Sequence, residues 1–224
     1  MTEPEVEREF WDLLNADEAA ELERRSRRQQ WRRGAVIFRE EETTDSVIVL
    51  RTGRVKIFCH TAGGGEVVLA IRGPGALLGE LSAIDREPRS ATVQALEPVT
   101  GLATPFQEFE AYLQTHARVT YLLMRILAAK LRDADRKRIE FGAYDTTGRV
   151  AARLVEMAER FGRPSAQGVR IALPLSQDEI AGWTGASREA VSKALGVLRA
   201  AGLVQTGRMS VTVLDLDALR DRAR

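Results

Sequence analysis

Residues 176–195 read SQDEIAGWTGASREAVSKAL, and this stretch decides how the C-terminal part of the chain folds. Ser176 and Glu179 have the S-x-x-E spacing of a capping box, in which hydroxyl and carboxylate satisfy backbone amides and start a helix. Gly185 falls where a tight turn between two helices requires a positive φ. Ser187 can then cap the second helix. The stretch therefore predicts a helix-turn-helix.

The second predicted helix has an apolar side and a polar side. Four residues at helical spacing predict a buried stripe: Val191, Ala194, Leu195 and Leu198. On the polar side, Arg188 can donate two hydrogen bonds to guanine, and Glu189 can accept one from cytosine N4. They lie at the N-terminal end of the helix, which a recognition helix presents to the major groove. A solvated charged face is the alternative for each charge taken singly.

A wing and the charge distribution complete this C-terminal pattern. Residues 203–213 read as two strands around Gly207, where Arg208 can meet a phosphate. The net charge is only +1, but residues 1–115 carry 14 Lys and Arg against 20 Asp and Glu, whereas residues 146–224 carry 12 against 8. A basic C-terminal part favours a polyanion, here double-stranded DNA. The predicted DNA-binding residues are Ser176, Gln177, Ser187, Arg188, Glu189, Ser192, Lys193 and Arg208.

A second motif lies at residues 78–93, LGELSAIDREPRSATV. Backbone amides at a helix start, the Arg89 guanidinium and the Ser90 hydroxyl are all donors that can converge on one small anion, so the motif predicts a phosphate cradle. Glu80 would repel a phosphate and is better placed to accept from a ribose 2′-hydroxyl. The alternative is that Arg89 and Glu80 form a structural salt bridge.

The rest of the chain divides into a strand-rich part and a helical part. β-Branched runs at residues 47–50, 55–58, 67–71 and 92–96, separated by glycines, predict a sandwich or barrel. From Phe106 to about Tyr144 the periodicity is helical, and an a/d seam suits pairing with a second copy of the helix. The seam residues are Met124, Leu127, Leu131, Ala134, Arg138 and Phe141. A single amphipathic helix lying on its own barrel is the alternative.

Composition excludes several classes of protein. No uncharged apolar run approaches the roughly 20 residues that span a bilayer, and the N-terminus, MTEPEVEREF, is acidic rather than basic and apolar. Cys59 is the only cysteine, so neither a disulfide scaffold nor a four-cysteine iron–sulfur site is expected. The two histidines, His60 and His116, lie far from the cradle carboxylates, and no H-E-x-x-H occurs. We expect a cytoplasmic, non-enzymatic protein with no membrane contact, no catalytic residues and no metal ligands.

With both motifs in this order and a long helix between them, nearly the whole sequence resembles the cAMP receptor protein and fumarate-nitrate reduction regulator (Crp/Fnr) family of bacterial transcription regulators. The landmarks that carry the resemblance are Gly34, Phe38, Asp45-Ser46, Gly53-Arg54-Val55, Gly75, Gly79-Glu80-Leu81-Ser82, Pro88-Arg89-Ser90-Ala91, Thr147-Gly148-Arg149-Val150 and Ser187-Arg188-Glu189-Ala190-Val191.

The resemblance implies an α+β fold in three parts: a cyclic-nucleotide-binding β-roll at residues 1–115, a dimerisation helix at 116–144 and a winged helix-turn-helix at 145–224. It implies no certain cofactor, but cAMP or another cyclic nucleotide as effector, a homodimer, TGTGA-like palindromic half-sites and RNA polymerase as a partner. The positions that match the family's effector site are Gly79, Glu80, Leu81, Ser82, Arg89, Ser90, Ala134 and Asp135.

Two departures from the family pattern bear on the effector. Relatives that sense cAMP place a Thr followed by Ser or Asn on the dimer helix, where this chain has Ala134 and Asp135. Asp135 can accept from a purine amine or stand as a solvent-facing charge, and both interpretations stay open. A barrel turn that usually carries Glu-Gly reads Glu40-Glu41-Glu42, so the sequence leaves the geometry of this turn open.

The sequence thus predicts a homodimeric DNA-binding regulator gated by a cyclic nucleotide, with cAMP as the first choice. The alternatives are a Crp-like regulator that needs no effector and one that senses a different small ligand. A nucleotide hydrolase and a protein-interaction module with a vestigial helix-turn-helix are further alternatives. The first lacks catalytic constellations, and the second conflicts with the intact Arg188, Glu189 and Lys193.

Overall fold

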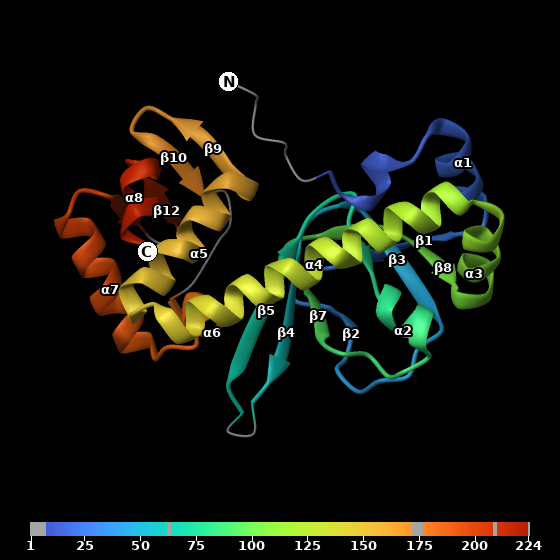
Figure 1. The fold of residues 1–224 in the computed structure, drawn as a ribbon, viewed down its shortest axis with the longest axis horizontal. Coiled ribbons are helices and arrows are strands. Elements are labelled where there is room, and N and C mark those ends of the chain that lie inside the picture. The colour runs from blue at the N-terminus through green and yellow to red at the C-terminus, as the bar shows by residue number, and fades with distance from the viewer. Residues whose placement is uncertain (1–7, 62–63, 172–176, 208–209, 224) are drawn as a thin grey trace. The chain divides into compact units, whose positions relative to one another are not determined.

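The structure is a computed structural model, and it describes residues 8–61, 64–171, 177–207 and 210–223. Its Cα positions divide the chain into two compact units (Figure 1). The N-terminal unit is Met1–Thr61 with Val68–Arg132, and the C-terminal unit is Ala62–Val67 with Asp133–Arg224. Each unit combines helices with antiparallel sheet, so the predicted α+β class is confirmed. No helix of the described ranges is long and apolar enough to cross a membrane.

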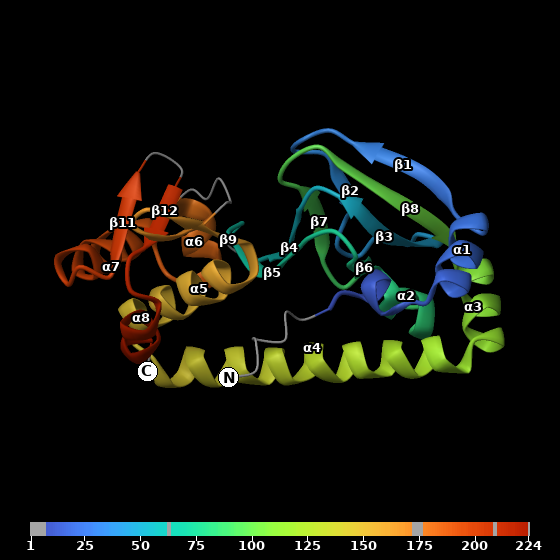
Figure 2. The same cartoon turned by 90° about the horizontal axis from the view of Figure 1, so that it is seen from above.

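The N-terminal unit is built on two four-stranded sheets. One has the order β1-β8-β3-β6 and the other β2-β7-β4-β5, and β1 lies beside β8 at the edge of its sheet (Figure 2). The strands are β1 (Arg27–Trp31), β2 (Val36–Phe38), β3 (Ser46–Thr52), β4 (Val55–His60), β5 (Glu66–Arg72), β6 (Leu77–Leu78), β7 (Thr92–Ala95) and β8 (Val99–Pro105). The four predicted β-branched runs are confirmed as β3, β4, β5 and β7.

Strand β3 is buried on both faces, and for this reason its run of residues is apolar without alternation. Successive strand residues face opposite sides, and both sides of β3 are covered. Val47 and Val49 join a cluster with Phe109, whereas Ile48 and Leu50 join a second cluster with Val55 and Phe38. Val47, Ile48, Val49 and Leu50 are at most 2 % exposed. The strand therefore supplies both halves of the core of this unit.

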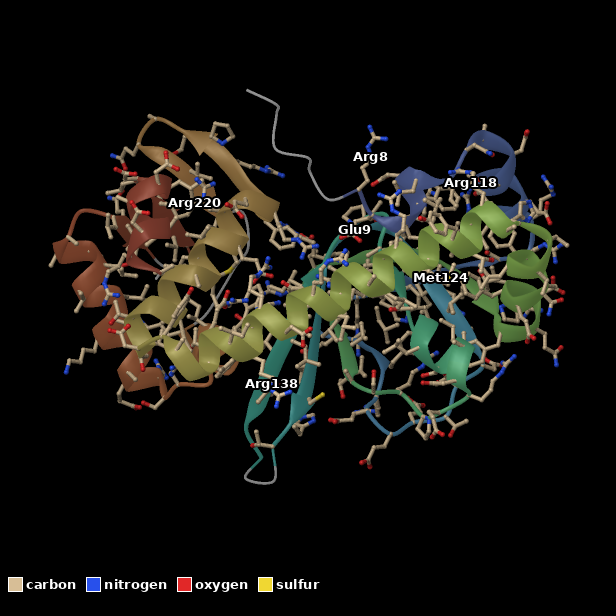
Figure 3. All side chains as sticks on the ribbon, in the orientation of Figure 1. Arg8, Glu9, Arg118, Met124, Arg138 and Arg220 are labelled. Carbon is tan, nitrogen blue, oxygen red and sulfur yellow. The ribbon has the colours of Figure 1, made fainter. Side chains whose placement is uncertain are left out.

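Helices flank the N-terminal sheets. They are the 3₁₀ turn η1 (Phe10–Leu13), α1 (Ala16–Arg24), α2 (Glu80–Asp85), α3 (Phe106–Thr115) and the first part of α4 (Ala117–Ala143). Asn15 and Glu18 form a capping box at the start of α1. Arg118, which Figure 3 labels near the start of α4, pairs with Glu18 at 2.7 Å. These contacts fix the start of α4 on α1. Farther along α4, Tyr121, Met124 and Leu131 are 60 %, 54 % and 64 % exposed.

The turn at Glu40-Glu41-Glu42 keeps a geometry that glycine normally supplies. Glu41 has φ +66°, in the left-handed region that favours glycine. Its amide donates to the carbonyl of Arg89 at 2.8 Å, and the amide of Arg89 donates to the carbonyl of Glu42 at 3.0 Å. Backbone hydrogen bonds with Arg89 thus hold the turn in place, with a glutamate in the left-handed conformation.

The C-terminal unit packs helices on one side of a third sheet, whose order is β11-β12-β10-β9. Its remaining elements are α5 (Thr146–Phe161), β9 (Gly162–Ser165), β10 (Gly168–Ile171), α6 (Gln177–Thr184), α7 (Arg188–Ala200), β11 (Val204–Gly207), β12 (Ser210–Val213) and α8 (Leu216–Arg222). The predicted stripe on α7 is confirmed, since Val191, Ala194, Leu195 and Leu198 are at most 3 % exposed. The predicted winged helix-turn-helix is present, and β9, β10 and α8 extend it.

Candidate functional site

The turn between α6 and α7 has the geometry that its glycine predicted. Gly185 has φ +59°, and Ser187 caps α7 by accepting a hydrogen bond from the amide of Ala190 at 3.2 Å. A Cβ at Gly185 would lie 2.5 Å from Cε1 of Phe141, so the ring of Phe141 covers the turn. The end of α4 therefore packs on the helix-turn-helix, and glycine is required for both the backbone and the contact.

The predicted DNA-contacting side chains lie together at the start of α6 and α7. The exposed ones are Gln177, Ser187, Arg188, Glu189, Ser192 and Lys193. Hydrogen bonds from its own backbone amide and from the Ser187 hydroxyl lower the pKa of Glu189, so its carboxylate is an acceptor at neutral pH. Arg188 is 3.8 Å from Asp178, and both side chains are more than 60 % exposed. Ser176, with its predicted capping box, and Arg208 lie outside the described residues.

Arg149, a landmark of the family resemblance to which the sequence assigned no role, is a positioning residue. Its Nε donates to the carbonyl of Thr184, the last residue of α6, at 2.9 Å, and its Nη1 donates to the carbonyl of Tyr144 at 2.8 Å. A guanidinium suits this place because carbonyls at helix ends lack partners within the helix. Arg149 thus ties the end of α6 to the chain that follows α4.

The cradle motif places an acid and a base inside the N-terminal unit. Gly79 has φ +79° and precedes α2, and the side chains of Glu80, Ser82 and Arg89 belong to residues only 5 %, 5 % and 3 % exposed. Leu81 is 45 % exposed, and Ser90 is exposed as well. The motif therefore contributes both buried polar groups and surface groups.

Arg89 is held by backbone carbonyls. Its Nη1 donates to Gly79 at 2.9 Å and its Nη2 donates to Ser46, while the guanidinium carbon lies 3.7 Å from the ring centroid of Phe38. Its Nε is buried without a hydrogen-bond partner. Burial lowers the pKa of Arg89 to about 10, against the opposing effect of nearby Glu80, so the group stays charged at neutral pH.

Glu80 has a partner that sequence reasoning missed. Lys130 Nζ of α4 lies 2.6 Å from Glu80 Oε1, and the Glu80 side chain is 7 % exposed. The proposed structural salt bridge between Glu80 and Arg89 is therefore wrong, because the carboxylate pairs with Lys130. Ala134 and Asp135 lie one turn farther along α4 and are exposed. They belong to the C-terminal unit, whereas Glu80, Arg89 and Lys130 belong to the N-terminal unit.

Comparison with known proteins assigns a family to both parts of the chain. Residues 28–116 match the cyclic nucleotide-binding domain, and residues 148–222 match the Crp-like helix-turn-helix domain. The CRP-like cAMP-activated global transcriptional regulator of Mycobacterium tuberculosis is 33 % identical over 86 % of this chain and 86 % of its own. This chain belongs to the Crp/Fnr family of transcription regulators.

Two further proteins resemble this chain, one in sequence and one in structure. The cyclic AMP receptor protein of Thermus thermophilus is 30 % identical over 88 % of each chain. The structure of the c-di-GMP responsive global regulator CLP of Xanthomonas campestris has a TM-score of 0.81, at 23 % identity over 90 % of this chain and all of that one. The first likeness is in sequence and the second is in fold. One of these proteins is named for cyclic AMP and the other for c-di-GMP, so membership of the Crp/Fnr family does not by itself identify the effector of this chain.

Proposed function

We propose that this Crp/Fnr regulator is a cytoplasmic homodimer that binds double-stranded DNA and is gated by a cyclic nucleotide, with cAMP as the first choice. The observation that carries the proposal is the pair of buried charges, Glu80 and Arg89, inside the part that matches a cyclic nucleotide-binding domain. The chain acts by binding rather than by catalysis. RNA polymerase is its proposed partner at promoters.

The donors of the cradle suit a cyclic phosphate. Arg89 Nε is a buried donor without a partner, and an unpaired buried donor costs roughly 1–3 kcal/mol, which a phosphate oxygen would recover. The Ser90 hydroxyl is exposed next to it in sequence. Glu80 is the acceptor for a ribose hydroxyl, and Lys130 is the group with which that hydroxyl competes. Backbone at Gly79 and Leu81 and the side chain of Ser82 complete the proposed effector site within this unit, and Ala134 and Asp135 are the residues proposed to recognise the base.

The exposed apolar side chains of α4 support the homodimer. Tyr121, Met124, Leu131 and Ile139 are 54–68 % exposed, and exposed apolar rows on a helix favour association. A two-fold dimer would set its two recognition helices about 34 Å apart, one turn of DNA. The expected target is therefore a palindrome with TGTGA-like half-sites, read by Arg188, Glu189 and Lys193. Gln177, Ser187 and Ser192, with Ser176 and Arg208, supply the proposed backbone contacts.

A second candidate is a regulator that binds DNA without an effector. The favouring observation is that Arg89 already donates to two carbonyls and Glu80 already pairs with Lys130. An intramolecular lysine in the place of a ligand hydroxyl would keep the cradle ordered without a nucleotide. The two candidates differ in one measurable property, the affinity of the isolated protein for cAMP.

Calorimetric titration of the full-length protein with cAMP, and then with cGMP, tests the choice. The gated regulator binds one nucleotide per chain, and Arg89→Gln weakens that binding at least tenfold while melting of the C-terminal unit is unchanged. Arg118→Gln serves as a control because Arg118 pairs with Glu18, away from the cradle motif. No heat of binding with either nucleotide would reject the gated regulator and favour the second candidate.

Arg188→Ala tests the reading of bases separately. Loss of a bidentate contact should cost roughly 1–3 kcal/mol and relax specificity at one base pair of each half-site. The measurement is binding to a set of palindromes that vary one position at a time. An unchanged preference at every position would refute the assignment of Arg188.

A further inference from the structure

Two arginines face outward side by side on the sheet of the C-terminal unit. The register sets Arg163 of β9 opposite Arg170 of β10, and Arg170 opposite Thr212 of β12. Thr212 in turn lies opposite Gln205 of β11. Directly opposed residues point to the same side of a sheet, so these four form one row across all four strands. We call the surface formed by these four residues, Arg163, Arg170, Thr212 and Gln205, the arginine face.

The helices cover the other side of the sheet. The next row contains Val169, Val213 and Val204, and the last two are 1 % and 2 % exposed. Arg163, Arg170 and Gln205 are exposed. The arginine face is therefore the solvent side, and its side chains are not needed for the core.

The side chains of Arg163 and Arg170 make no ion pair or hydrogen bond with any residue in the described part of the chain. Other arginines of this unit do have carboxylate partners, such as Arg220 with Glu159 at 2.8 Å. Like charges directly opposed on neighbouring strands lie about 5 Å apart at Cβ and destabilise a sheet. An anion between the two guanidinium groups would turn this repulsion into attraction.

Hollows beside the row are lined by neutral donors and by further arginine. One, of about 380 Å³, is lined by residues that include Arg170, Thr212, Gln205, Ser165 and Ser210. Another, of about 650 Å³, adjoins Arg199 of α7, whose Nη1 donates to Thr206 Oγ1 at 3.1 Å. Among the residues that the structure describes, no acidic side chain lines either hollow. The two hollows thus connect the row on β10 and β12 with the wing strand β11 and with Arg199 at the C-terminal end of α7.

We propose that the arginine face binds backbone phosphates of the DNA that flanks the half-site read by α7. The proposal rests on the proposed function, since α7 must first bring DNA to this unit. Charge complementarity and continuity with α7 and the wing identify DNA as the occupant. Phosphate contacts of this kind add affinity without reading sequence.

The salt dependence of DNA binding tests the proposal. Each phosphate neutralised contributes about −0.9 to the slope of log K against log salt on duplex DNA. Two arginines in each subunit of a dimer give about −3.6. The double substitution Arg163→Gln with Arg170→Gln should therefore flatten the slope by about 3.6 on a palindrome with flanks of about one helical turn, or 10 bp, on each side. On a duplex trimmed to the half-sites the slope should not change.

A matched control removes the same charge elsewhere. Arg24→Gln with Arg27→Gln changes two exposed arginines of the N-terminal unit and should leave both slopes as in the wild type. Thermal melting of the Arg163 and Arg170 double variant should match or exceed the wild type, because a like-charge pair is gone. That result shows that the variant is folded.

Three outcomes overturn the proposal. An unchanged slope on the long duplex, with the palindrome still preferred over a scrambled sequence, shows that the arginine face does not bind DNA. An equal change of the slope on both duplexes shows that the two arginines contact the half-site itself or act through long-range electrostatics, and not through the flanking phosphates. Unchanged DNA binding with reduced transcription by added polymerase assigns the face to an acidic protein surface. If the wild type does not prefer the palindrome, the proposed function itself fails.

Discussion

Substituting Lys130 by Met should show how much stability the protein loses when the buried carboxylate of Glu80 has no ion-pair partner. Met keeps the length of the aliphatic stem and removes the ammonium. Glu80 then stays in a site where its side chain is 7 % exposed, without the cation 2.6 Å away. Removal of one partner of a fully buried pair costs roughly 3–5 kcal/mol. Because Lys130 is itself 31 % exposed, we expect a smaller loss than this, about 2–3 kcal/mol.

Urea denaturation followed by tryptophan fluorescence measures this loss, since Trp11 and Trp31 lie in the N-terminal unit. With a slope of about 2–3 kcal/mol per M, the midpoint should fall by roughly 1 M. Arg28→Gln is the matched control. The Arg28–Glu23 pair is of similar length, at 2.7 Å, but its side chains are 83 % and 41 % exposed, so its loss should cost below about 1 kcal/mol.

The comparison isolates burial as the cause of the cost. If Lys130→Met lost no more stability than Arg28→Gln, the Glu80–Lys130 pair would not persist in solution, and the competition proposed between Lys130 and a ribose hydroxyl would be refuted. If it loses 2–3 kcal/mol, saturating cAMP should recover more stability in the variant than in the wild type. The reason is that the freed carboxylate then gains a donor.

Three further substitutions test local geometry. Glu41→Gly should raise the free energy of unfolding by about 0.5–1 kcal/mol in urea titration, because φ is +66° there. Gly185→Ala should cost at least about 1–2 kcal/mol and weaken DNA binding, and adding Phe141→Ala should restore only the part caused by the ring contact at 2.5 Å; simple additivity of the two would contradict the contact. Asp145→Ala should cost about 1 kcal/mol at neutral pH. The amide of Gly148, which Asp145 caps, lowers the pKa of Asp145, so its contribution is complete above the ordinary carboxyl pKa and is lost as the pH falls through the lowered value; a cost still present in acid would contradict this.

Local signals were enough to predict the helix-turn-helix and the main strands. Gly185, the Ser187 cap and the α7 stripe each act within a few residues, so the sequence specifies them directly. Strands β9 and β10 were missed because the four residues of β9, GRPS, have little β propensity. The strand forms because β10 pairs with it and the helices cover the sheet, which is tertiary context.

The sequence predicted the residues of the candidate site but not the residues with which they form hydrogen bonds and ion pairs. Glu80 and Arg89 were identified from one short motif, yet Arg89 donates to Ser46 and Glu80 pairs with Lys130, 43 and 50 residues away. No spacing rule relates residues so far apart. The one available signal for Lys130 was a buried acid in the cradle that needed a cation. The arginine face depends in the same way on strand register, which sets Arg163 against Arg170.

The most direct test of the proposed function is the affinity of the full-length protein for a labelled palindrome with TGTGA-type half-sites, compared with a scrambled duplex. Salt is held constant because phosphate contacts make affinity strongly dependent on it. The measurement is made without nucleotide, with saturating cAMP and with saturating cGMP. The gated regulator predicts a specific complex that tightens with cAMP. Equal affinity for palindrome and scrambled duplex under all three conditions would contradict sequence-specific regulation, and a specific complex indifferent to both nucleotides would contradict the gate.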